Sequence, residues 1–255
     1  MGMGDEIMAT ALARMARARD PRRVRIVGRG GEARWHEVWL HNPNLAQPHE
    51  RGNFQQLVCG AGARPYVDTY DKTRWHFREW AREPGELYFT KNEIEAARKY
   101  AGCIIIDPHI KRKASPNKRW PWLKWSRLVA LAAQDGVMLS QLKYDAQPLL
   151  HGAHAIRTKD LRQSLAVLSM ARAAVLHEGG LHHAAAALGV PAVVIFGGFV
   201  APRFTGYDSH INLFTGGEAC GSRLPCDHCR DAMNRIEPQH VLRHLYKLLD
   251  QRKSA

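Results

Sequence analysis

A segment rich in glycine and histidine, residues 177–186, carries groups suited to binding a phosphorylated ligand. It lies between a predicted buried strand and a predicted helix, where Gly179 and Gly180 allow backbone N–H groups to approach a phosphate. Glu178 can accept hydrogen bonds from the hydroxyls of a ribose or sugar, and His183 lies on the first helical turn. A tight turn in which Glu178 caps the helix needs the same residues, so both interpretations stay open.

Two further strand ends should reach the same edge of the sheet as this turn. One precedes Gly197, and the other precedes residues 110–127, which contain seven basic residues, three tryptophans and no acid. Ligands bind at the carboxyl ends of parallel strands, so we predict that Lys118 contacts a diphosphate. Binding of nucleic acid by the same basic and aromatic side chains is the alternative. We expect Trp122 and Trp125 to be core residues of the next helix.

Asp5 follows Gly4 at the start of the first predicted helix. An aspartate at this position most often caps the helix, and the helix dipole keeps it ionised. An ionised carboxylate at a cleft can also act as a general base on a hydroxyl group. Composition alone favours the cap over the base.

A cysteine motif near the C-terminus can hold a metal ion. The motif is C-x5-C-x2-C, formed by Cys220, Cys226 and Cys229. The spacing of the last two suits a tetrahedral zinc site, and reduced structural thiols are the alternative. His228 is too close to Cys229 to be an easy fourth ligand, so we expect His210 or His240 there. Because the motif lies past the last predicted strand, we expect Cys226→Ser to lower stability without changing ligand binding.

The candidate residues need a fold that brings strand ends together. Continuous β-branched runs separated by short helices predict a parallel sheet covered on both faces. We expect residues 101–255 to form a complete doubly wound domain and residues 1–100 a less regular one. Strands are predicted at residues 24–27, 55–59, 103–107, 137–142, 173–176 and 191–196. Helices are predicted at residues 5–19, 66–84, 86–101, 121–133, 161–168 (with Thr158 as its N-cap), 181–188 and 238–249.

Three short sequence motifs occur in an order that can be compared with that of a known protein family. They are Met3-Gly4-Asp5 before a helix, Lys118-Arg119-Trp120-Pro121 after a strand, and residues 178–197, which join a Glu-Gly-Gly turn to a helix and the next strand. They resemble the Gly-Asp, Lys-x-Trp-Pro and Asp-Thr-Gly-x-x-His-x-x-Ala-Ala motifs of glycosyltransferase family 9, the heptosyltransferase-like enzymes. Here Glu178-Gly179 stands where that family has Asp-Thr.

The resemblance implies an α/β fold of the GT-B-like class. Two Rossmann-like, doubly wound parallel-sheet domains would face a cleft. The N-terminal one (residues 1–100), on the acceptor side, is reduced here, and the C-terminal one (residues 101–255) would bind the nucleotide sugar. It also implies an inverting, metal-independent transfer from a nucleotide-diphosphate sugar, with Asp5 as the catalytic base. No cofactor is required for catalysis on this interpretation. The donor contacts that it implies are Lys118, Glu178, Gly179, Gly180, His183 and Gly197.

The net charge indicates which class of partner the protein binds, and the cysteine content indicates its cellular compartment. Lys and Arg number 37 against 24 Asp and Glu, and the net charge of +13 favours a polyanionic acceptor, either a phosphorylated glycolipid or DNA. A non-catalytic GT-B-like nucleic-acid-binding protein is the alternative. No apolar run reaches the length of a membrane span, although peripheral membrane contact fits the charge. An odd number of cysteines and no secretory signal predict a reducing, cytoplasmic location.

Overall fold

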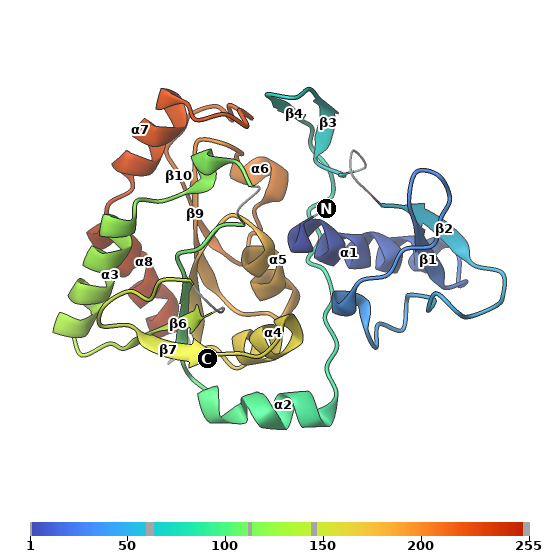
Figure 1. Cartoon of the computed structure of the whole chain (residues 1–255), viewed down its shortest axis with the longest axis horizontal. Coiled ribbons are helices and arrows are strands. Elements are labelled where there is room, and N and C mark those ends of the chain that lie inside the picture. The colour runs from blue at the N-terminus through green and yellow to red at the C-terminus, as the bar shows by residue number, and fades with distance from the viewer. Residues whose placement is uncertain (1, 60–63, 112–113, 144–146, 252–255) are drawn as a thin grey trace.

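A parallel sheet is built around three strands that are apolar at nearly every position. The computed structural model describes residues 2–59, 64–111, 114–143 and 147–251. Within these ranges, six parallel strands pair in the order β10-β9-β8-β5-β6-β7 (Figure 1). Their bounds are β5 (Ile104–Asp107), β6 (Leu139–Lys143), β7 (His154–Arg157), β8 (Ala173–His177), β9 (Ala192–Gly197) and β10 (Ile211–Phe214).

Both faces of this sheet are buried. Along β8, Ala174 and Leu176 pack into one cluster of core side chains, and Ala173 and Val175 pack into the other. Successive side chains of a strand point to opposite faces, so a strand covered on both sides must be apolar throughout. The covering helices are α3 (Trp122–Gln134), α7 (Asp227–Arg235) and α8 (Pro238–Gln251) on one face and α4 (Leu161–Ser169) and α5 (Gly180–Ala187) on the other, with the short α6 (Pro202–Thr205) after β9 (Figure 1).

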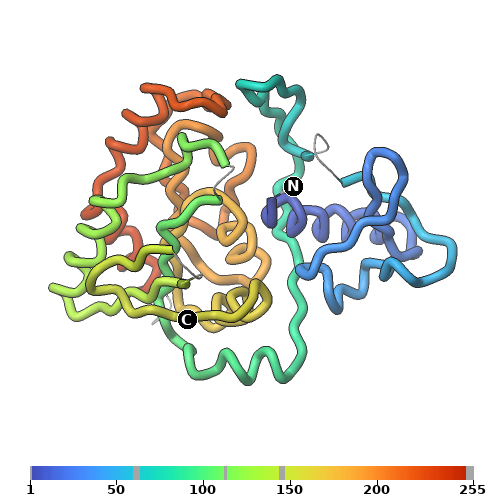
Figure 2. Tube along the Cα trace, in the orientation of Figure 1, coloured from blue at the N-terminus to red at the C-terminus, as the bar shows by residue number. Residues whose placement is uncertain are grey.

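The N-terminal part of the chain is a reduced version of the same arrangement. Its strands β1 (Val24–Val27) and β2 (Gln55–Val58) are parallel, with the short 3₁₀ helix η1 (Glu37–Trp39) between them in the sequence. Helix α1 (Met3–Arg19) precedes β1, and its N-terminal end packs against α5 of the other part (Figure 1). Figure 2 shows the chain returning from this part to the large sheet through α2 (Lys91–Ala97) and η2 (Arg98–Tyr100).

The amphipathic helix predicted at residues 66–84 is wrong. The chain forms an antiparallel hairpin there, with strands β3 (Val67–Tyr70) and β4 (Trp75–Phe77). Trp75 and Phe77 alternate with the exposed His76, and their rings lie 5.7 and 5.8 Å from the buried Phe199 ring. Trp75 and Phe77 point to the same face because both pack against Phe199, which is distant in the sequence. The residues of the segment alone do not reveal this contact, so they could not predict the strand.

Three smaller expectations also differ from the structure. Helix α4 is capped by Asp160, whose carboxylate accepts the N–H of Gln163 at 2.7 Å, and not by Thr158. Trp125 is fully buried as expected, but Trp122 is 38% exposed and lies beside His109. Strands β7 and β10 and helices α6 and α7 were not predicted because they are short or polar. Among the described residues, none of the helices is long and apolar enough to cross a bilayer.

Candidate active site

A cavity of about 650 Å³ lies where α1, the β3–β4 hairpin and the carboxyl ends of β5 and β8 meet. Its wall contains most of the residues that the sequence singled out, although they come from distant parts of the chain. The predicted site residues that line it are Asp5, Lys118, Glu178, Gly179, Gly180 and His183. Gly197 is not among the lining residues, because it packs against Met233 of α7.

Two helix N-termini meet at this cavity. A Cβ atom on Gly4 of α1 would come within 2.4 Å of the His183 ring, and one on Gly180 of α5 would come within 2.4 Å of Met3. A side chain at position 4 would collide with the His183 ring, and one at position 180 would displace the Met3 side chain, so the two glycines allow the helices to approach closely. Helix N-termini carry unpaired N–H groups and a partial positive charge, so this end of the cavity favours an anionic ligand.

Asp5 is a nearly buried carboxylate with three donors around it. Its Oδ2 accepts the backbone N–H of Gly2 at 3.1 Å and Nε–H of Arg64 at 3.0 Å. Its Oδ1 accepts the Tyr66 hydroxyl at 3.0 Å. Burial, and then the Asp5 charge, raise the pKa of Tyr66 well above its usual value, so Tyr66 stays protonated and donates. Oδ1 therefore receives one hydrogen bond within the described chain and keeps acceptor capacity for a hydroxyl.

Arg64 and Tyr66 were not predicted as site residues. They lie about sixty positions from Asp5, Tyr66 at the start of the segment predicted as a helix and Arg64 just before it, and nothing in their local spacing connects them to Asp5. The Arg64 guanidinium lies 4.6 Å from the Trp75 ring, so the hairpin holds it over Asp5. The hairpin therefore completes the site from the N-terminal part.

Lys118 and Glu178 form an ion pair in the cavity wall, and Lys118 Nζ lies 5.0 Å from the Phe199 ring. Glu178 is buried, and its Oε1 lies 3.9 Å from Nε2 of His183. Burial lowers the pKa of His183 to about 4, so the ring is neutral at pH 7. The carboxylate favours the tautomer with the proton on Nε2, and the Tyr207 hydroxyl then donates to Nδ1 at 2.8 Å.

Asp107 ends β5 at the cavity wall and is a third residue that was not predicted as a site residue. Burial raises its pKa to about 7, which makes it a candidate partner for ligand hydroxyls in either protonation state. Its position at the carboxyl end of a buried strand was the available signal. Behind it, His177 Nε2 accepts the backbone N–H of Trp120 at 2.9 Å and so connects β8 to the segment that follows Lys118.

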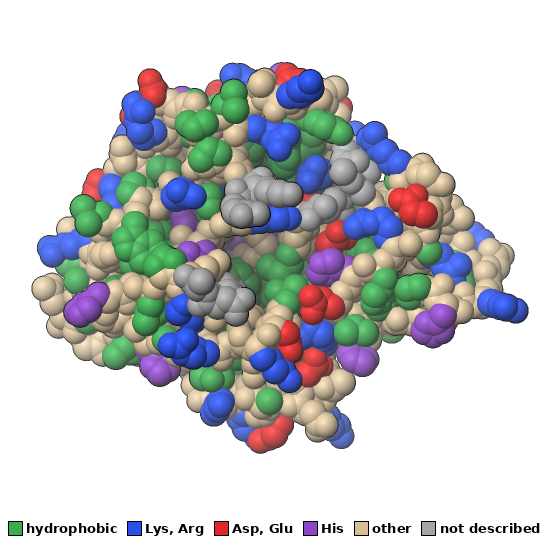
Figure 3. All heavy atoms as spheres, viewed as in Figure 1, with side chains coloured by type: hydrophobic (Ala, Val, Ile, Leu, Met, Phe, Trp, Pro, Cys, Tyr) green, Lys and Arg blue, Asp and Glu red, His purple; other side chains and the backbone are tan. Residues whose placement is uncertain are grey.

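The space-filling view shows Lys and Arg side chains around the central hollow of one face (Figure 3). The cavity wall includes five basic residues besides its acids, namely Arg64, Lys111, Lys118, Lys159 and Arg223. Such a rim raises the local concentration of an anionic ligand.

The cysteine motif forms a separate cluster with His228. Ligand atoms of Cys220, Cys226, His228 and Cys229 lie within 4.8 Å of one another. The sulfurs of Cys220 and Cys226 are 3.7 Å apart, near the roughly 3.8 Å that two thiolates on a tetrahedral zinc ion with bonds of about 2.3 Å require. The Cys229 thiol and the N–H of Ser222 donate to Cys220 and lower its pKa to about 5, which favours the thiolate that binds metals.

The expected fourth ligand, His210 or His240, is wrong. His210 contacts the carbonyl of Val190, and His240 lies beside His244, so neither reaches the cysteines. His228 reaches them because side chains of a first helical turn lean back toward the N-terminus, even when they are consecutive in sequence. Its Nε2 contacts the Gly216 carbonyl at 2.7 Å, which leaves Nδ1 for the cluster.

A second group of metal-ligating residues lies at the cavity wall, with Glu178 and His183 lining the cavity and His182 buried behind them. Ligand atoms of Glu178, His182 and His183 lie within 4.8 Å of one another. The Lys118 ammonium already neutralises Glu178 there. A cation in that position would face the lysine charge at close range, so this group is poorly suited to a metal ion.

Comparison with known proteins places the fold. A crystal structure of a family 9 glycosyl transferase from Veillonella parvula has a TM-score of 0.65 at 14% identity, and the match covers 98% of this chain and 95% of that one. Escherichia coli ADP-heptose LPS heptosyltransferase II has a TM-score of 0.50 at 22% identity over 66% of this chain. The iron-containing dodecameric glycosyltransferase TibC of enterotoxigenic E. coli has a TM-score of 0.50 at 18% identity over 71%.

The chain spans about half the length of the last two enzymes, 54% and 52% respectively. The likeness confirms the GT-B-like α/β fold expected from the sequence, with the reduced N-terminal part described above. A search among curated proteins found no match. The family model of glycosyltransferase family 9 (heptosyltransferase) matches residues 79–240, more than half of the 255 residues. The chain therefore belongs to glycosyltransferase family 9.

Proposed function

We propose that this protein is an inverting glycosyltransferase that moves a sugar from a nucleotide-diphosphate donor to a hydroxyl group of a polyanionic acceptor. One observation carries the proposal. A single cavity holds a carboxylate with acceptor capacity, Asp5, together with a lysine and a helix N-terminus suited to phosphate, Lys118 and α5. A nucleophile to be deprotonated and a leaving diphosphate need these two chemistries on opposite sides of one carbon atom.

In the proposed reaction, Asp5 takes the proton of the acceptor hydroxyl at Oδ1. The acceptor oxygen forms a bond to the anomeric carbon, and the bond from that carbon to the diphosphate oxygen breaks. The electron pair of that bond leaves with the diphosphate. Attack from the face opposite the leaving group inverts the anomeric configuration.

Lys118 and the N–H groups at Gly179 and Gly180 would receive the charge that develops on the diphosphate. The Lys118–Glu178 ion pair holds the ammonium in place before a donor arrives. Fixed donors aimed at developing charge contribute about 3–4 kcal/mol each to transition-state stabilisation. These groups supply positive charge from the chain itself, so the transfer is proposed to need no metal ion.

The donor is proposed to be a nucleoside-diphosphate sugar, with ADP-heptose as the first candidate. A cavity of about 650 Å³ lies within the range of roughly 300–1,000 Å³ that small-molecule sites occupy. The heptosyltransferase TibC, to which this chain is similar in fold, is described in complex with ADP-D-beta-D-heptose. Glu178 and Asp107 are placed to accept hydrogen bonds from the ribose or sugar hydroxyls.

The acceptor is proposed to be a polyanion, because the net charge is +13 and basic side chains surround the hollow. A phosphorylated glycolipid, met at the membrane periphery from the cytoplasm, and DNA share the phosphate chemistry that such a rim attracts. A catalytically inactive protein that binds nucleic acid through the same rim is the alternative. Turnover of a nucleotide sugar separates the two functions.

The test is an incubation of the purified protein with ADP-heptose and, separately, lipopolysaccharide-core glycolipid and hydroxymethylated DNA. Release of ADP, product mass and the anomeric configuration by NMR are measured with and without EDTA. We expect one acceptor to give an inverted product at a rate that EDTA does not change. Donor binding without transfer to any phosphorylated acceptor, together with salt-sensitive DNA binding, would favour the inactive alternative.

We also propose that Cys220, Cys226, His228 and Cys229 hold a structural zinc ion. Three cysteines and one histidine make a closed four-ligand set of the kind that structural zinc sites use. TibC is described as iron-containing, so iron is the competing metal. Elemental analysis of the purified protein tests this, with one equivalent of zinc expected. No bound metal leaves the four residues as reduced thiols and a histidine.

A further inference from the structure

The segment between the first two cysteines, residues 220–226 (the cysteine loop), contacts three parts of the cavity wall. The N–H groups of Cys220 and Gly221 donate to the carbonyls of Gly198 and Phe199 at 3.0 and 2.9 Å. Phe199 is the residue whose ring lies under Lys118. The first contact of the cysteine loop is therefore with the residues that directly follow β9.

The second contact is with the β3–β4 hairpin. The Gly221 carbonyl accepts the backbone N–H of Trp75 at 2.9 Å, and the backbone N–H of Arg223 donates to the Thr73 carbonyl at 2.7 Å. Arg223 itself lines the cavity, and Trp75 lies against Arg64, the partner of Asp5. The cysteine loop thus pairs with the hairpin like an additional short strand.

The third contact is with the turn that carries Lys118, through the side chain of Asn117. Its Nδ2 donates to the carbonyls of Ser222 and Leu224 at 2.8 and 2.7 Å, and its Oδ1 accepts the N–H of Cys226 at 3.1 Å. The Ser115 hydroxyl donates to the same Ser222 carbonyl at 2.8 Å. Asn117 is nearly buried, so water cannot easily replace these three hydrogen bonds.

The ends of the cysteine loop are fixed by the cluster itself. Cys220 and Cys226 converge on Cys229 and His228 of α7, with Sγ atoms of Cys220 and Cys229 2.9 Å apart. A seven-residue loop whose two ends meet at one cluster has few conformations available. The contacts that hold the cluster together therefore also fix the positions of the Ser222 and Leu224 carbonyls, which accept hydrogen bonds from Asn117.

We propose that Asn117 is a positioning residue that links the cysteine cluster to Lys118, so that the state of the cluster sets the affinity for the donor diphosphate. The inference rests on the proposed function, because it takes Lys118 as the diphosphate contact. It reverses the expectation that loss of Cys226 leaves donor binding unchanged. The cluster lies past the last strand in the sequence, but one side chain separates it from the turn of Lys118.

The first experiment is independent of any ligand. Hydrogen exchange of the backbone amides of Lys118 and Arg119 is measured in the wild type, Asn117→Ala and Cys226→Ser. These amides donate to Ser115 and Pro116 within the turn, at 3.2 and 3.1 Å. We expect exchange at both to be at least about tenfold faster in both variants. Asn117→Ala removes the hydrogen bonds that hold the turn, and Cys226→Ser removes the sulfur that fixes the end of the cysteine loop to the cluster. Unchanged exchange at these amides overturns the proposal.

Asn44→Ala is the matched control for this measurement. Asn44 is an amide that accepts from Arg17 at 3.0 Å and donates to Glu86 at 2.8 Å, away from the cavity. Its loss should lower overall stability without accelerating exchange at the Lys118 turn. Equal acceleration in the control would mean that Asn117 acts only through global stability, and it would also overturn the proposal.

The second experiment measures ADP affinity by calorimetry in wild type, Asn117→Ala, Lys118→Ala and the double variant. We expect Asn117→Ala to raise the Kd for ADP by about tenfold, and to add little once Lys118 is already alanine. Additive effects of the two changes would overturn the link between Asn117 and Lys118. If the wild type binds no nucleoside diphosphate, the proposed function fails, while the exchange experiment still decides whether the cluster positions the turn.

Discussion

Asp5 has two roles in one position, because its carboxylate accepts the N–H of the N-cap residue Gly2 and also faces the cavity. We predict that Asp5→Asn lowers transfer by about 10²–10⁴-fold, the usual contribution of a positioned base. The amide has one acceptor oxygen for three donors, so we also expect a loss of about 1–3 kcal/mol in unfolding free energy. Donor affinity should stay within about threefold, measured by calorimetry beside transfer rates.

Glu6→Gln provides the control for this substitution. Glu6 is the next residue of α1, is equally buried, and pairs with Arg34 at 2.8 Å, but it does not line the cavity. It should cost similar stability and leave transfer nearly intact. Full transfer in a folded Asp5→Asn protein would falsify the catalytic assignment of Asp5.

Lys118→Ala is predicted to act mainly on the diphosphate. Removal of the ammonium leaves Glu178 unpaired beside the leaving group, so transfer should fall by about 10²–10³-fold. Lys124→Ala is the matched control, because Lys124 also forms an ion pair, with Glu237 at 2.7 Å, but lies outside the cavity wall. Steady-state rates at saturating acceptor measure the difference. Equal rates for the two variants contradict the assignment of Lys118.

The site residues that could be predicted from the sequence all carry a local signal. Asp5 opens a helix, Lys118 follows a buried strand, and Gly179 and Gly180 form a strand-to-helix turn. Arg64, Tyr66 and Asn117 carry none, because their partners lie across the molecule and only the folded chain brings them together. His228 was set aside on the basis of sequence distance, which does not describe how side chains at a helix start converge.

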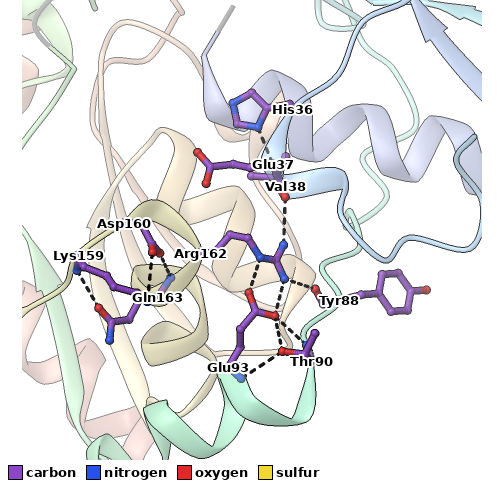
Figure 4. Close-up of polar contacts among 10 residues, drawn as sticks. All are labelled: His36, Glu37, Val38, Tyr88, Thr90, Glu93, Lys159, Asp160, Arg162 and Gln163. Carbon is purple, nitrogen blue, oxygen red and sulfur yellow. Dashed lines mark hydrogen bonds and ion pairs between the residues drawn. The ribbon is translucent and has the colours of Figure 1, made fainter. Parts of the chain in front are cut away.

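At the scale of elements, Arg162 of α4 joins three segments near the cavity, as Figure 4 shows. Its guanidinium donates to Glu93 of α2 and to the carbonyls of Tyr88 and Glu37, at 2.7 and 3.0 Å for the carbonyls. Glu37 belongs to η1 in the N-terminal part. One buried cation therefore holds α4, α2 and η1 together, next to the cavity residues of the α4 N-terminus.

The Arg162 contact predicts a pH dependence. Hydrogen bonds from Arg162 lower the pKa of Glu93 from 4.5 to about 2. A carboxylate with a lowered pKa stabilises the fold at pH values above 4.5, and this contribution is lost as the pH falls toward 2. We predict that Glu93→Gln costs about 1–2 kcal/mol at pH 7, and that the difference from wild type shrinks between pH 4.5 and 2.

Urea unfolding at a series of pH values measures this difference. Glu95→Gln, which removes an exposed pair with Arg98 on the same helix, is the control and should show no comparable effect. A Glu93→Gln penalty that stays constant below pH 4.5 contradicts the ionic role.

The sequence predicted the strands that are buried on both faces of the sheet, and it did not predict the hairpin, which is covered on one face only. The strands β5, β8 and β9 are continuous apolar runs, which no exposed structure tolerates, so they were predictable. The hairpin β3–β4 mixes charges with aromatic residues, and its period of two depends on Phe199 from another part of the chain. A helix and a half-covered hairpin differ little in composition, so the sequence could not separate them.

At the scale of the whole molecule, one cluster of core side chains contains residues from both sides of the predicted domain boundary at residue 100. Ile7, Met8 and Trp39 of the N-terminal part belong to the same cluster of buried side chains as Leu181 and Ala184 of α5. The close approach of α1 and α5 at Gly4 and Gly180 makes this contact tight. A domain interface of this kind resembles an interior, so we propose that residues 1–100 and 101–255 unfold as one unit.

Met8→Ala tests that unity, because Met8 lies one turn after Gly4 on α1 and is fully buried. The truncation should lower the unfolding free energy by about 2–5 kcal/mol. If the chain unfolds as one unit, amide protection in β8 must fall by the same amount as protection in β1, although β8 lies beyond residue 100. If the parts are separate domains, protection falls in β1 alone. Leu123→Ala, at a position 80% exposed on α3, should leave both unchanged. The cavity lies where the two parts meet. If the chain unfolds as one unit, α1 separates from α5 only when the whole molecule unfolds, so opening the proposed active site by this route costs the full free energy of unfolding.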